Sequence, residues 1–432
     1  MTIASQRTIL SLFTGAGGLD LGLEAAGFST RVAVEMDGDS ARTLRRNRDW
    51  PVIDRDIHTV ASEEMLDWAG LREGDVDLLV GGPPCQPFSK SGYWAHGDAR
   101  RLSDPRATTL EAYLRVLRDV KPRAFLLENV AGLAYQGKSE GLDLLLRTID
   151  GINRESGTRY AVSYQLLDAS QYGVPQDRER VFLVGQRDGG RFVFPAPTHV
   201  AAGAVGTEAL ALAGGIRRDV DLEPCRTAWD AIGDLESDDD ARLRMGGKWA
   251  DLLPSIPEGH NYLFHTDRGG GLPLFGWRRR YWSFLLKLEK RRPAWTITAQ
   301  PGSAIGPFHW RSRRLSMREL CRLQTFPDNF EITGSLMAVQ RQVGNAVPSA
   351  LAERMGLCIR RQLFGDHVDE RRPLTLAPAR REPIPLPVSP EAVPRKYLDL
   401  VGAHSAHPGT GRGHRAAARE RPDDTYGVFA LA

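Results

Sequence analysis

The segment TILSLFTGAGGLDLG, residues 8–22, joins a short apolar run to a glycine-rich loop and a second apolar run. Residues 8–13 have the composition of a buried strand, and LDLGLEAAGF after the loop has the spacing of a helix. The loop lacks the GK[ST] ending of a P-loop, and Asp20 stands where a dinucleotide-binding G-x-G-x-x-G loop has its third glycine. The segment therefore predicts a strand, loop and helix whose ligand carries no pyrophosphate.

Apolar runs alternate with helical segments along the first half of the chain, which is typical of an open, mostly parallel α/β sheet of the Rossmann-like type. Further strands are predicted at 30–37, 76–84, 123–130 and 181–187, with a helix at about 109–120. Ligands of such sheets bind beyond the carboxyl ends of the strands. We therefore expect Phe13, Glu35, Cys85 and Glu128 to lie on one rim.

The rim residues suggest a nucleoside cofactor. Glu35 follows the glycine loop by about 20 residues, the distance at which an acid meets ribose hydroxyls. S-adenosylmethionine fits, with its carboxylate on the loop amides, its ribose on Glu35 and its adenine against Phe13. The alternative is a helix-capping turn followed by a surface acid.

Composition limits the class of protein. The chain has 432 residues, 41% hydrophobic and 26% charged, which suggests two or three domains. Its four cysteines are far apart and form no CxxC pair, so we expect no disulfide framework, no metal site and a reducing, cytoplasmic location. No apolar run approaches the ~20 residues that span a bilayer, so no membrane association is expected. A net charge of +3 is too small to identify a nucleic-acid partner.

One cysteine lies in an unusual setting. In GGPPCQPFS, residues 81–89, Cys85 follows two glycines and two prolines, which predicts a loop with a fixed backbone. Such a loop can present a reactive thiol, because the preceding strand ends on the predicted rim. The alternative is a small buried side chain in a turn, the commoner state of a free cysteine.

Six segments together resemble the ordered motifs of the DNA (cytosine-5)-methyltransferase family, between residue 8 and about residue 352. They are SLFTGAGGLDLG, GGPPCQPFS, ENV, QYGVPQDRERVFLVG, RRLSMRELCRLQTFPDNF and RQVGNAVPSALA. Two small departures occur: Ser11 replaces a usual acid, and Arg55 precedes Asp56 where glycine is common. Both bear on cofactor affinity rather than on the reaction.

The resemblance implies a catalytic set of Cys85, Glu128, Arg178 and Arg180. A thiolate suits addition to carbon 6 of cytosine, since it is nucleophilic and can leave again. Glu128 would supply a proton or hydrogen bond at N3 if burial raises its pKa. In an extended QDRER segment Gln176, Arg178 and Arg180 share one face, with Arg180 toward the base and Arg178 supporting the site. The alternatives are a surface glutamate and a charged turn.

The resemblance also implies ligand contacts. The cofactor-binding set is Phe13, Thr14, Gly15, Gly17, Gly18, Leu19, Glu35, Met36, Asp56, Ile57, Pro83, Asn345 and Ala346. The DNA-binding set is Gln86, Ser89, Arg278, Arg279 and Arg280. Residues 276–295 hold seven basic and five aromatic residues against one acid, which suits a DNA surface or, alternatively, an amphipathic helix with a solvated basic face.

The motifs predict the domain organisation. An S-adenosylmethionine-dependent methyltransferase domain spans 1–187 and is completed by 335–365, which includes a long helix within 344–364. A smaller target-recognition domain and connecting motif span 188–334, where SMRE opens a helix that stops before Pro327. Residues 366–432, rich in proline, arginine and alanine, are expected to be an extended, disordered tail. The segment 89–106 is expected to close over DNA as a mobile loop.

These inferences predict a sequence-specific DNA cytosine-5 methyltransferase that acts as a monomer on flipped-out cytosine in double-stranded DNA. Its setting is a restriction-modification or anti-phage system, with a cognate restriction enzyme or defence protein as partner, and it would lie on the nucleoid when bound to DNA. Methylation of RNA, in particular tRNA, and a catalytically silent DNA-binding regulator are the alternatives. The target sequence, and the group that removes the carbon 5 proton, do not follow from the sequence.

Overall fold

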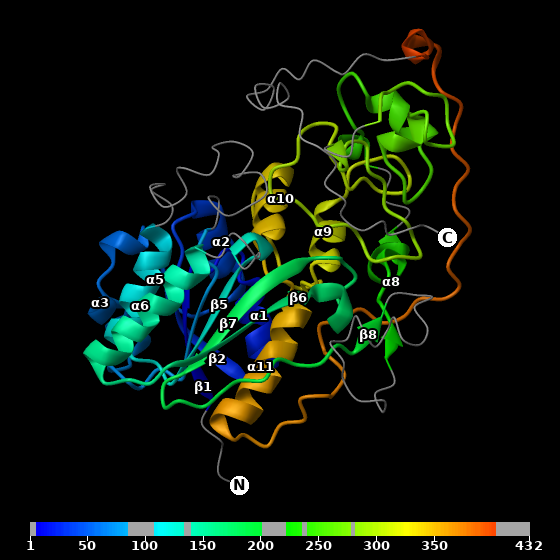
Figure 1. The fold of residues 1–432 in the computed structure, drawn as a ribbon. Helices are drawn as coiled ribbons and strands as arrows, with labels where there is room; N and C mark the ends of the chain where they lie inside the picture. Colours follow the sequence, from blue (N-terminus) through cyan, green and yellow to red (C-terminus); the bar gives the residue numbers. More distant parts are fainter. Residues whose placement is uncertain are drawn as a thin grey trace.

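The computed structural model describes residues 6–84, 108–133, 140–200, 222–235, 240–277 and 281–402. Within these residues a seven-stranded sheet has the order β3-β2-β1-β4-β5-β7-β6 (Figure 1). Its strands are β1 (Arg7–Leu12), β2 (Phe28–Val34), β3 (Val52–Ile53), β4 (Leu78–Gly81), β5 (Ala124–Val130), β6 (Ala161–Asp168) and β7 (Glu179–Gln186). β7 pairs antiparallel with β5 and β6, whereas the other pairings are parallel. The predicted α/β fold is confirmed.

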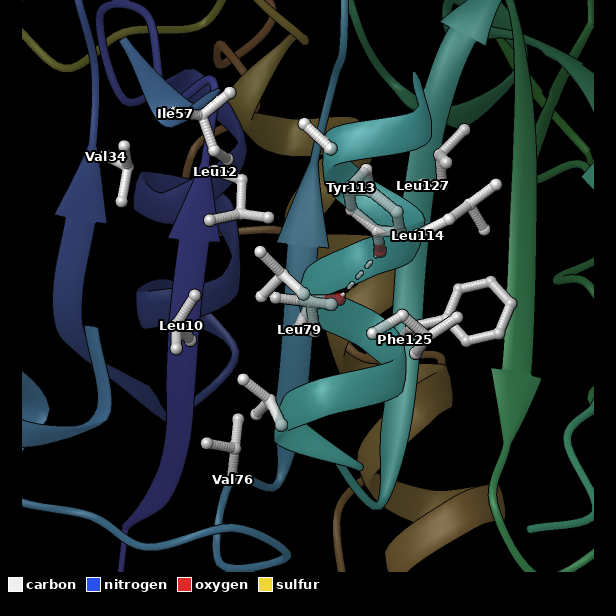
Figure 2. Close-up of a cluster of buried hydrophobic side chains, with 14 of the residues drawn as sticks. Leu10, Leu12, Val34, Ile57, Val76, Leu79, Tyr113, Leu114, Phe125 and Leu127 are labelled. Carbon is white, nitrogen blue, oxygen red and sulfur yellow. Dashed lines mark hydrogen bonds between the residues drawn. The ribbon is translucent and has the colours of Figure 1, made fainter. Parts of the chain in front are cut away.

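Helices cover both faces of the sheet. They are α1 (Gly18–Ala25), α2 (Gly38–Asn47), α3 (Ser62–Ala69), α5 (Thr108–Val120), α6 (Glu140–Ser156) and α11 (Ser349–Phe364). One hydrophobic cluster joins the sheet to α3, α5 and α6, and another joins its opposite face to α1 and α11. Figure 2 shows the first cluster, in which the hydroxyl of Tyr113 donates to the carbonyl of Leu79 at 3.3 Å. The alternation of side chains along each strand therefore divides the core into two layers.

The remaining chain forms a smaller lobe, residues 222–345, which we call the small lobe. It holds α8 (Ala228–Ile232), α9 (Met317–Leu323) and α10 (Leu336–Asn345), while β9 (Glu223–Pro224) pairs with β8 (His199–Val200). Two hydrophobic clusters, one around Trp310 and one around Tyr262, form its core. The predicted capping box of α9 is present, with Ser316 and Glu319 as the reciprocal pair.

Residues 335–345 were predicted to help complete the first domain; residues 336–345 form α10, which contacts both parts. Val339 and Val343 pack in the Trp310 cluster. Gln342 accepts a hydrogen bond from Thr43 on α2 at 2.8 Å, and Arg341 pairs with Asp39 at 2.8 Å. The helix therefore lies at the junction of the two parts.

The expectation of a disordered tail is wrong for residues 366–402. The structure describes them as a mainly extended segment that ends in a short 3-10 helix, Arg395–Leu400. Leu374, Leu376 and Ala377 pack on the cluster between the sheet and α11, and Tyr397 is 2% exposed in the Tyr262 cluster. Composition predicted the extended backbone but not the distant side chains that hold it. Residues 403–432 lie outside the described part.

Among the residues that the structure describes, no helix is both long and apolar enough to cross a membrane.

Candidate active site

The glycine loop after β1 is attached to the end of β2 by Glu35. One carboxylate oxygen of Glu35 accepts from the backbone N–H of Gly15 at 2.7 Å, and the other accepts from that of Asp37 at 2.7 Å. Burial raises the pKa of Glu35, and these two N–H groups oppose the rise because they favour the charged form. Each carboxylate oxygen has a second lone pair, so Glu35 remains able to accept from a ligand hydroxyl.

The loop leads into α1 against the segment between α10 and α11. A Cβ atom on Gly18 would lie 2.4 Å from the carbonyl oxygen of Val347 and 3.2 Å from the Cβ of Ala346, so only glycine fits. Phe13 has a positive φ of 52°, an unusual conformation for an aromatic residue and one that is concentrated at functional sites. The structure therefore places Ala346 against the glycine loop.

The other predicted cofactor residues vary in exposure. Thr14 is buried and its hydroxyl lies 3.0 Å from that of Ser11, and Gly17 caps α1 in the left-handed conformation. Met36 is 69% exposed, and Asn345 and Asp56 are also exposed. Leu19 and Ile57 are buried, with their side chains in hydrophobic clusters.

A buried ion pair lies at the ends of β5 and β7. The Nε of Arg180 is 2.9 Å from Oε1 of Glu128, with the two side chains 15% and 10% exposed. A Cβ on Gly82 would lie 2.9 Å from Oε2 of Glu128, so this glycine gives the carboxylate its space. Burial raises the pKa of Glu128, whereas the charges of Arg180 and Arg178 oppose the rise.

The loop after β4 is hydrogen-bonded to the end of β5, next to Glu128. Asn129 donates from Nδ2 to the carbonyl of Pro83 at 3.2 Å, while its Oδ1 accepts from the backbone N–H of Val130 at 2.8 Å. Pro83 is buried, and Pro84 ends the described part of this loop. The predicted nucleophile Cys85 and the predicted DNA contacts Gln86 and Ser89 lie outside the described residues, as does the loop 89–106.

The glycine loop, Glu35 after β2 and the Glu128–Arg180 pair against Gly82 therefore lie at the carboxyl ends of neighbouring strands. The family model described as C-5 cytosine-specific DNA methylase matches residues 7–361. The chain belongs to this family. It is a DNA (cytosine-5-)-methyltransferase, and the predicted family resemblance is confirmed.

Individual relatives agree with this assignment. The type II methyltransferase M.SacI of Streptomyces achromogenes is 40% identical over 382 residues, which cover 82% of this chain and 93% of that protein. The type II methyltransferase M.PspPI of Psychrobacter is 34% identical over 369 residues, covering 82% of this chain and 79% of the relative. A DNMT2 variant of Spodoptera frugiperda has a TM-score of 0.56 at 16% identity, over 83% of this chain and all of that one, which supports the fold.

In this methyltransferase Arg178 occupies a different position from Arg180. Its guanidinium is 1% exposed and donates to three carbonyl oxygens, those of Ile297 at 3.2 Å, Gly344 at 2.7 Å and Ala346 at 3.0 Å. Burial lowers the pKa of Arg178. The residue joins the sheet to the small lobe and to the turn that carries Asn345 and Ala346.

The third residue of the predicted face, Gln176, is fully buried and also contacts the small lobe. It donates to the carbonyl of Leu323 at 3.2 Å and accepts from the N–H of Ile297 at 3.0 Å. Of the three residues predicted to share one face, therefore, Arg180 pairs with Glu128. Gln176 and Arg178 instead contact the junction between the sheet domain and the small lobe.

The basic segment 276–295 of the methyltransferase has a mixed character. Trp277, Tyr281 and Trp282 are 40%, 39% and 44% exposed, and they flank the predicted DNA contacts Arg278, Arg279 and Arg280, which lie outside the described residues. Residues 281–295 form turns and isolated bridges rather than a helix, so the alternative of an amphipathic helix is wrong there.

Two lysines of this segment do not belong to a DNA surface. Lys287 and Lys290 are 4% and 2% exposed. Lys287 donates to the carbonyl of Ile256 at 2.7 Å, and Lys290 forms a buried ion pair with Glu258. Composition could not separate these structural lysines from Arg291 and Arg292 of the same segment, which are exposed.

Sequence reasoning assigned no role to Asn129 or to Asp20, which the structure places beside the loops of the site. The position of Asn129 directly after Glu128 in ENV was the available signal for the first. For Asp20 the signal was its place where a dinucleotide-binding loop has its third glycine. Within the described residues, no group of three or more histidine, cysteine or acidic side chains is arranged to hold a metal ion.

Proposed function

We propose that this methyltransferase transfers a methyl group from S-adenosylmethionine to carbon 5 of a cytosine within a specific duplex DNA sequence. The observation that carries the proposal is the buried Glu128–Arg180 pair against Gly82, three residues before Cys85. A nucleophile loop and a carboxyl group with a raised pKa lie at adjacent strand ends, which is what activation of a pyrimidine ring requires.

The residues around the glycine loop fit the cofactor. S-adenosylmethionine, when bound, supplies an electrophilic methyl group on a sulfonium. The backbone N–H groups at the start of α1 suit its carboxylate, and Glu35, already oriented by Gly15 and Asp37, suits its ribose hydroxyls. Phe13 is half-buried at the strand end, where its ring can contact an adenine. Met36, Asp56, Pro83, Asn345 and Ala346 would complete the walls.

Cys85 would begin the reaction by adding its thiolate to carbon 6 of cytosine. The π electron pair of the C5–C6 bond would then be available at carbon 5 to form a bond to the methyl group, and the electron pair of the broken sulfonium C–S bond would stay on sulfur. Loss of the carbon 5 proton to solvent and expulsion of the thiolate restore the aromatic ring and the free cysteine. The thiolate thus forms one bond and breaks the same bond within the cycle.

Glu128 would hold a proton at N3 during the addition. Since Arg180 occupies Oε1, we assign that proton to Oε2. Burial favours the protonated carboxyl, and a donor aimed at N3 stabilises the negative charge that develops on the ring. Arg180 fixes the carboxyl orientation and can donate to the cytosine O2 from its remaining N–H groups.

The target base must leave the DNA stack, which costs about a few kcal/mol. We propose that the small lobe reads the sequence, with Arg278, Arg279 and Arg280 as contacts to DNA and the exposed aromatic residues beside them. Gln86, Ser89 and the loop 89–106 would close over the flipped base. The setting we propose is protection of host DNA in a restriction-modification or anti-phage system, by a cytoplasmic monomer.

The experiment compares wild type with Cys85→Ser, and with Cys321→Ser as a matched control on α9. Each protein receives methyl-labelled S-adenosylmethionine with mixed-sequence duplex DNA or with RNA, and bisulfite sequencing maps the product. We expect carbon 5 methylation within one short sequence, lost in Cys85→Ser and kept in Cys321→Ser. Once the site is known, DNA with 5-fluorocytosine there should remain bound to wild type on a denaturing gel, since fluorine cannot leave as a cation.

Other outcomes would contradict parts of the proposal. Undiminished labelling by Cys85→Ser would exclude the covalent route. Labelled RNA with unlabelled DNA would favour the RNA alternative. Cofactor binding without transfer to either would favour a DNA-binding regulator.

A further inference from the structure

Residues 366–402, which we call the strap, lie beyond the family match and run from the foot of α11 to the far side of the small lobe (Figure 1, orange to red). Within the family match the two parts are joined by contacts such as those of Gln176 with Leu323 and of Arg178 with Ile297 and Gly344. The strap is a second, separate connection, and three buried carboxylates bind its backbone.

The first of these carboxylates is Glu353 on α11, which is fully buried. Its Oε1 accepts from the backbone N–H and the hydroxyl of Thr375 at 3.0 and 2.9 Å, and its Oε2 accepts from the N–H of Leu376 at 3.1 Å. Arg372 of the strap pairs with the same carboxylate at 2.8 Å. The strap therefore supplies the partners that a buried charge on the sheet domain needs.

The second carboxylate is Asp230 on α8 of the small lobe, 2% exposed. It accepts from the backbone N–H of Arg381 at 2.9 Å and pairs with Arg380 at 3.1 Å, besides closing the capping box of its own helix. Arg380 also donates to the carbonyl of Cys225 at 2.7 Å. Within a few residues the strap has thus crossed from α11 to α8.

The third carboxylate is Glu258, deep in the small lobe, whose Oε1 pairs with Lys290 and accepts from the N–H of Val388 at 2.9 Å. Beyond it the ring of Tyr397 stacks on Trp249, with centroids 5.8 Å apart and an interplanar angle of 16°. The hydroxyl of Tyr397 donates to the carbonyl of Lys248 at 2.6 Å.

We infer that the strap positions the small lobe relative to the catalytic rim, and so acts as a positioning segment for target selection. It costs free energy to leave a buried carboxylate without its hydrogen-bond donors. Each of the three carboxylates therefore holds the strap residues that donate to it in one position along its surface. With one attachment on α11 and two in the small lobe, rotation of the lobe would break at least one of them. The role in target selection rests on the proposed function; the positioning itself does not.

The test cuts the strap after the protein has folded. A site for a sequence-specific protease is inserted between Pro378 and Ala379, which separates the attachment to Glu353 from those to Asp230 and Glu258. The control carries the same site after Gly402, so that cleavage leaves the strap whole. Cut and uncut samples of each protein are compared by backbone hydrogen exchange over α8 and by methylation of the mapped target against single-mismatch targets.

We expect cleavage at 378/379 to accelerate exchange over α8 and to lower the preference for the target by about tenfold or more, because displacements of ~1 Å at a reacting group can cost ~100-fold. Affinity for S-adenosylmethionine should stay within about twofold, since the glycine loop lies on the sheet domain. Cleavage after Gly402 should change neither property. Unchanged exchange and preference after the 378/379 cut would overturn the inference.

A second pair of variants checks the contribution of one attachment. Val388→Pro removes the N–H that binds Glu258, whereas Leu386→Pro alters a side chain that is 79% exposed in the same proline-rich stretch. Only the first should reduce target preference; equal effects of the two would contradict the role of this hydrogen bond. If the uncut protein methylates no DNA, the proposed function fails. Hydrogen exchange over α8 in cut and uncut protein would still show whether the strap positions the small lobe.

Discussion

Replacement of Asp20 by asparagine should change how the stability of this methyltransferase depends on pH. Asp20 lies in the first turn of α1 and is 1% exposed. The hydroxyls of Ser11 and Thr30 donate to it at 3.1 and 3.3 Å, yet burial outweighs them and raises its pKa from 3.8 to about 7. The folded protein therefore holds a proton on Asp20 at pH values where the unfolded chain has lost it.

The sign of the effect follows from linkage. Below about pH 4 Asp20 is protonated in both states, and its contribution to the free energy of unfolding is then most favourable. As the pH rises from 3.8 toward 7, the unfolded chain releases its proton first and the folded state becomes relatively less stable. A shift of about 3 pKa units corresponds to about 4 kcal/mol in total, of which roughly 2.5 kcal/mol falls between pH 5 and pH 8.

The assay is urea unfolding of wild type and Asp20→Asn at pH 5, 6, 7 and 8, followed by tryptophan fluorescence. The free energy of unfolding of Asp20→Asn minus that of wild type should rise by roughly 2.5 kcal/mol across this range, since other titrating groups cancel in the difference. Asp49→Asn, which changes an exposed carboxylate, serves as control. Parallel curves for Asp20→Asn and wild type would refute the reasoning.

Four further predictions concern the site and the packing of the helices. Glu128→Gln should lower kcat about 100-fold to 10,000-fold in a methyl-transfer assay, because it removes the proton held for N3 but keeps the shape. Arg178→Lys should lower the melting temperature in calorimetry by about 4 °C or more, since three buried carbonyl oxygens share one guanidinium. Gly22→Ala should destabilise by about 3 kcal/mol in urea unfolding, because its Cβ would lie 2.2 Å from the carbonyl oxygen of Ser349 on α11. Gly151→Ala, with nothing within 4 Å of the added Cβ on α6, should instead stabilise by about 0.5–1 kcal/mol.

Local patterns predicted much of the sheet. The runs that became β1, β2, β4, β5 and β7 are apolar because both faces of those strands are covered by helices. β6 was missed because it is an edge strand whose side chains are partly exposed, with Tyr164 at 49%, so its composition is mixed. The sequence also did not predict that β7 is antiparallel to its neighbours. The direction of a strand depends on which neighbour it pairs with and not on its own residues.

The chemistry of the site was predicted from residue types in order along the chain, and the structure added their spatial relations. The sequence proposed Arg178 and Arg180 as a pair on one face. Their separation into a lobe-junction residue and a partner of Glu128 follows from which carbonyl oxygens and carboxylates the folded chain brings within 3.2 Å.

By itself, the sequence determined the α/β class, the family and the order of the proposed reacting groups. Apolar periodicity and short motifs depend only on residues that are close together along the chain. Only the tertiary structure decided that Lys290 is a buried partner of Glu258, and that a proline-rich tail is a strap held by Glu353, Asp230 and Glu258. Each of these contacts removes a charge from water by means of residues that lie between 22 and 151 positions away in the sequence. Burial of that kind is a property of the whole fold, and no local window of sequence contains it.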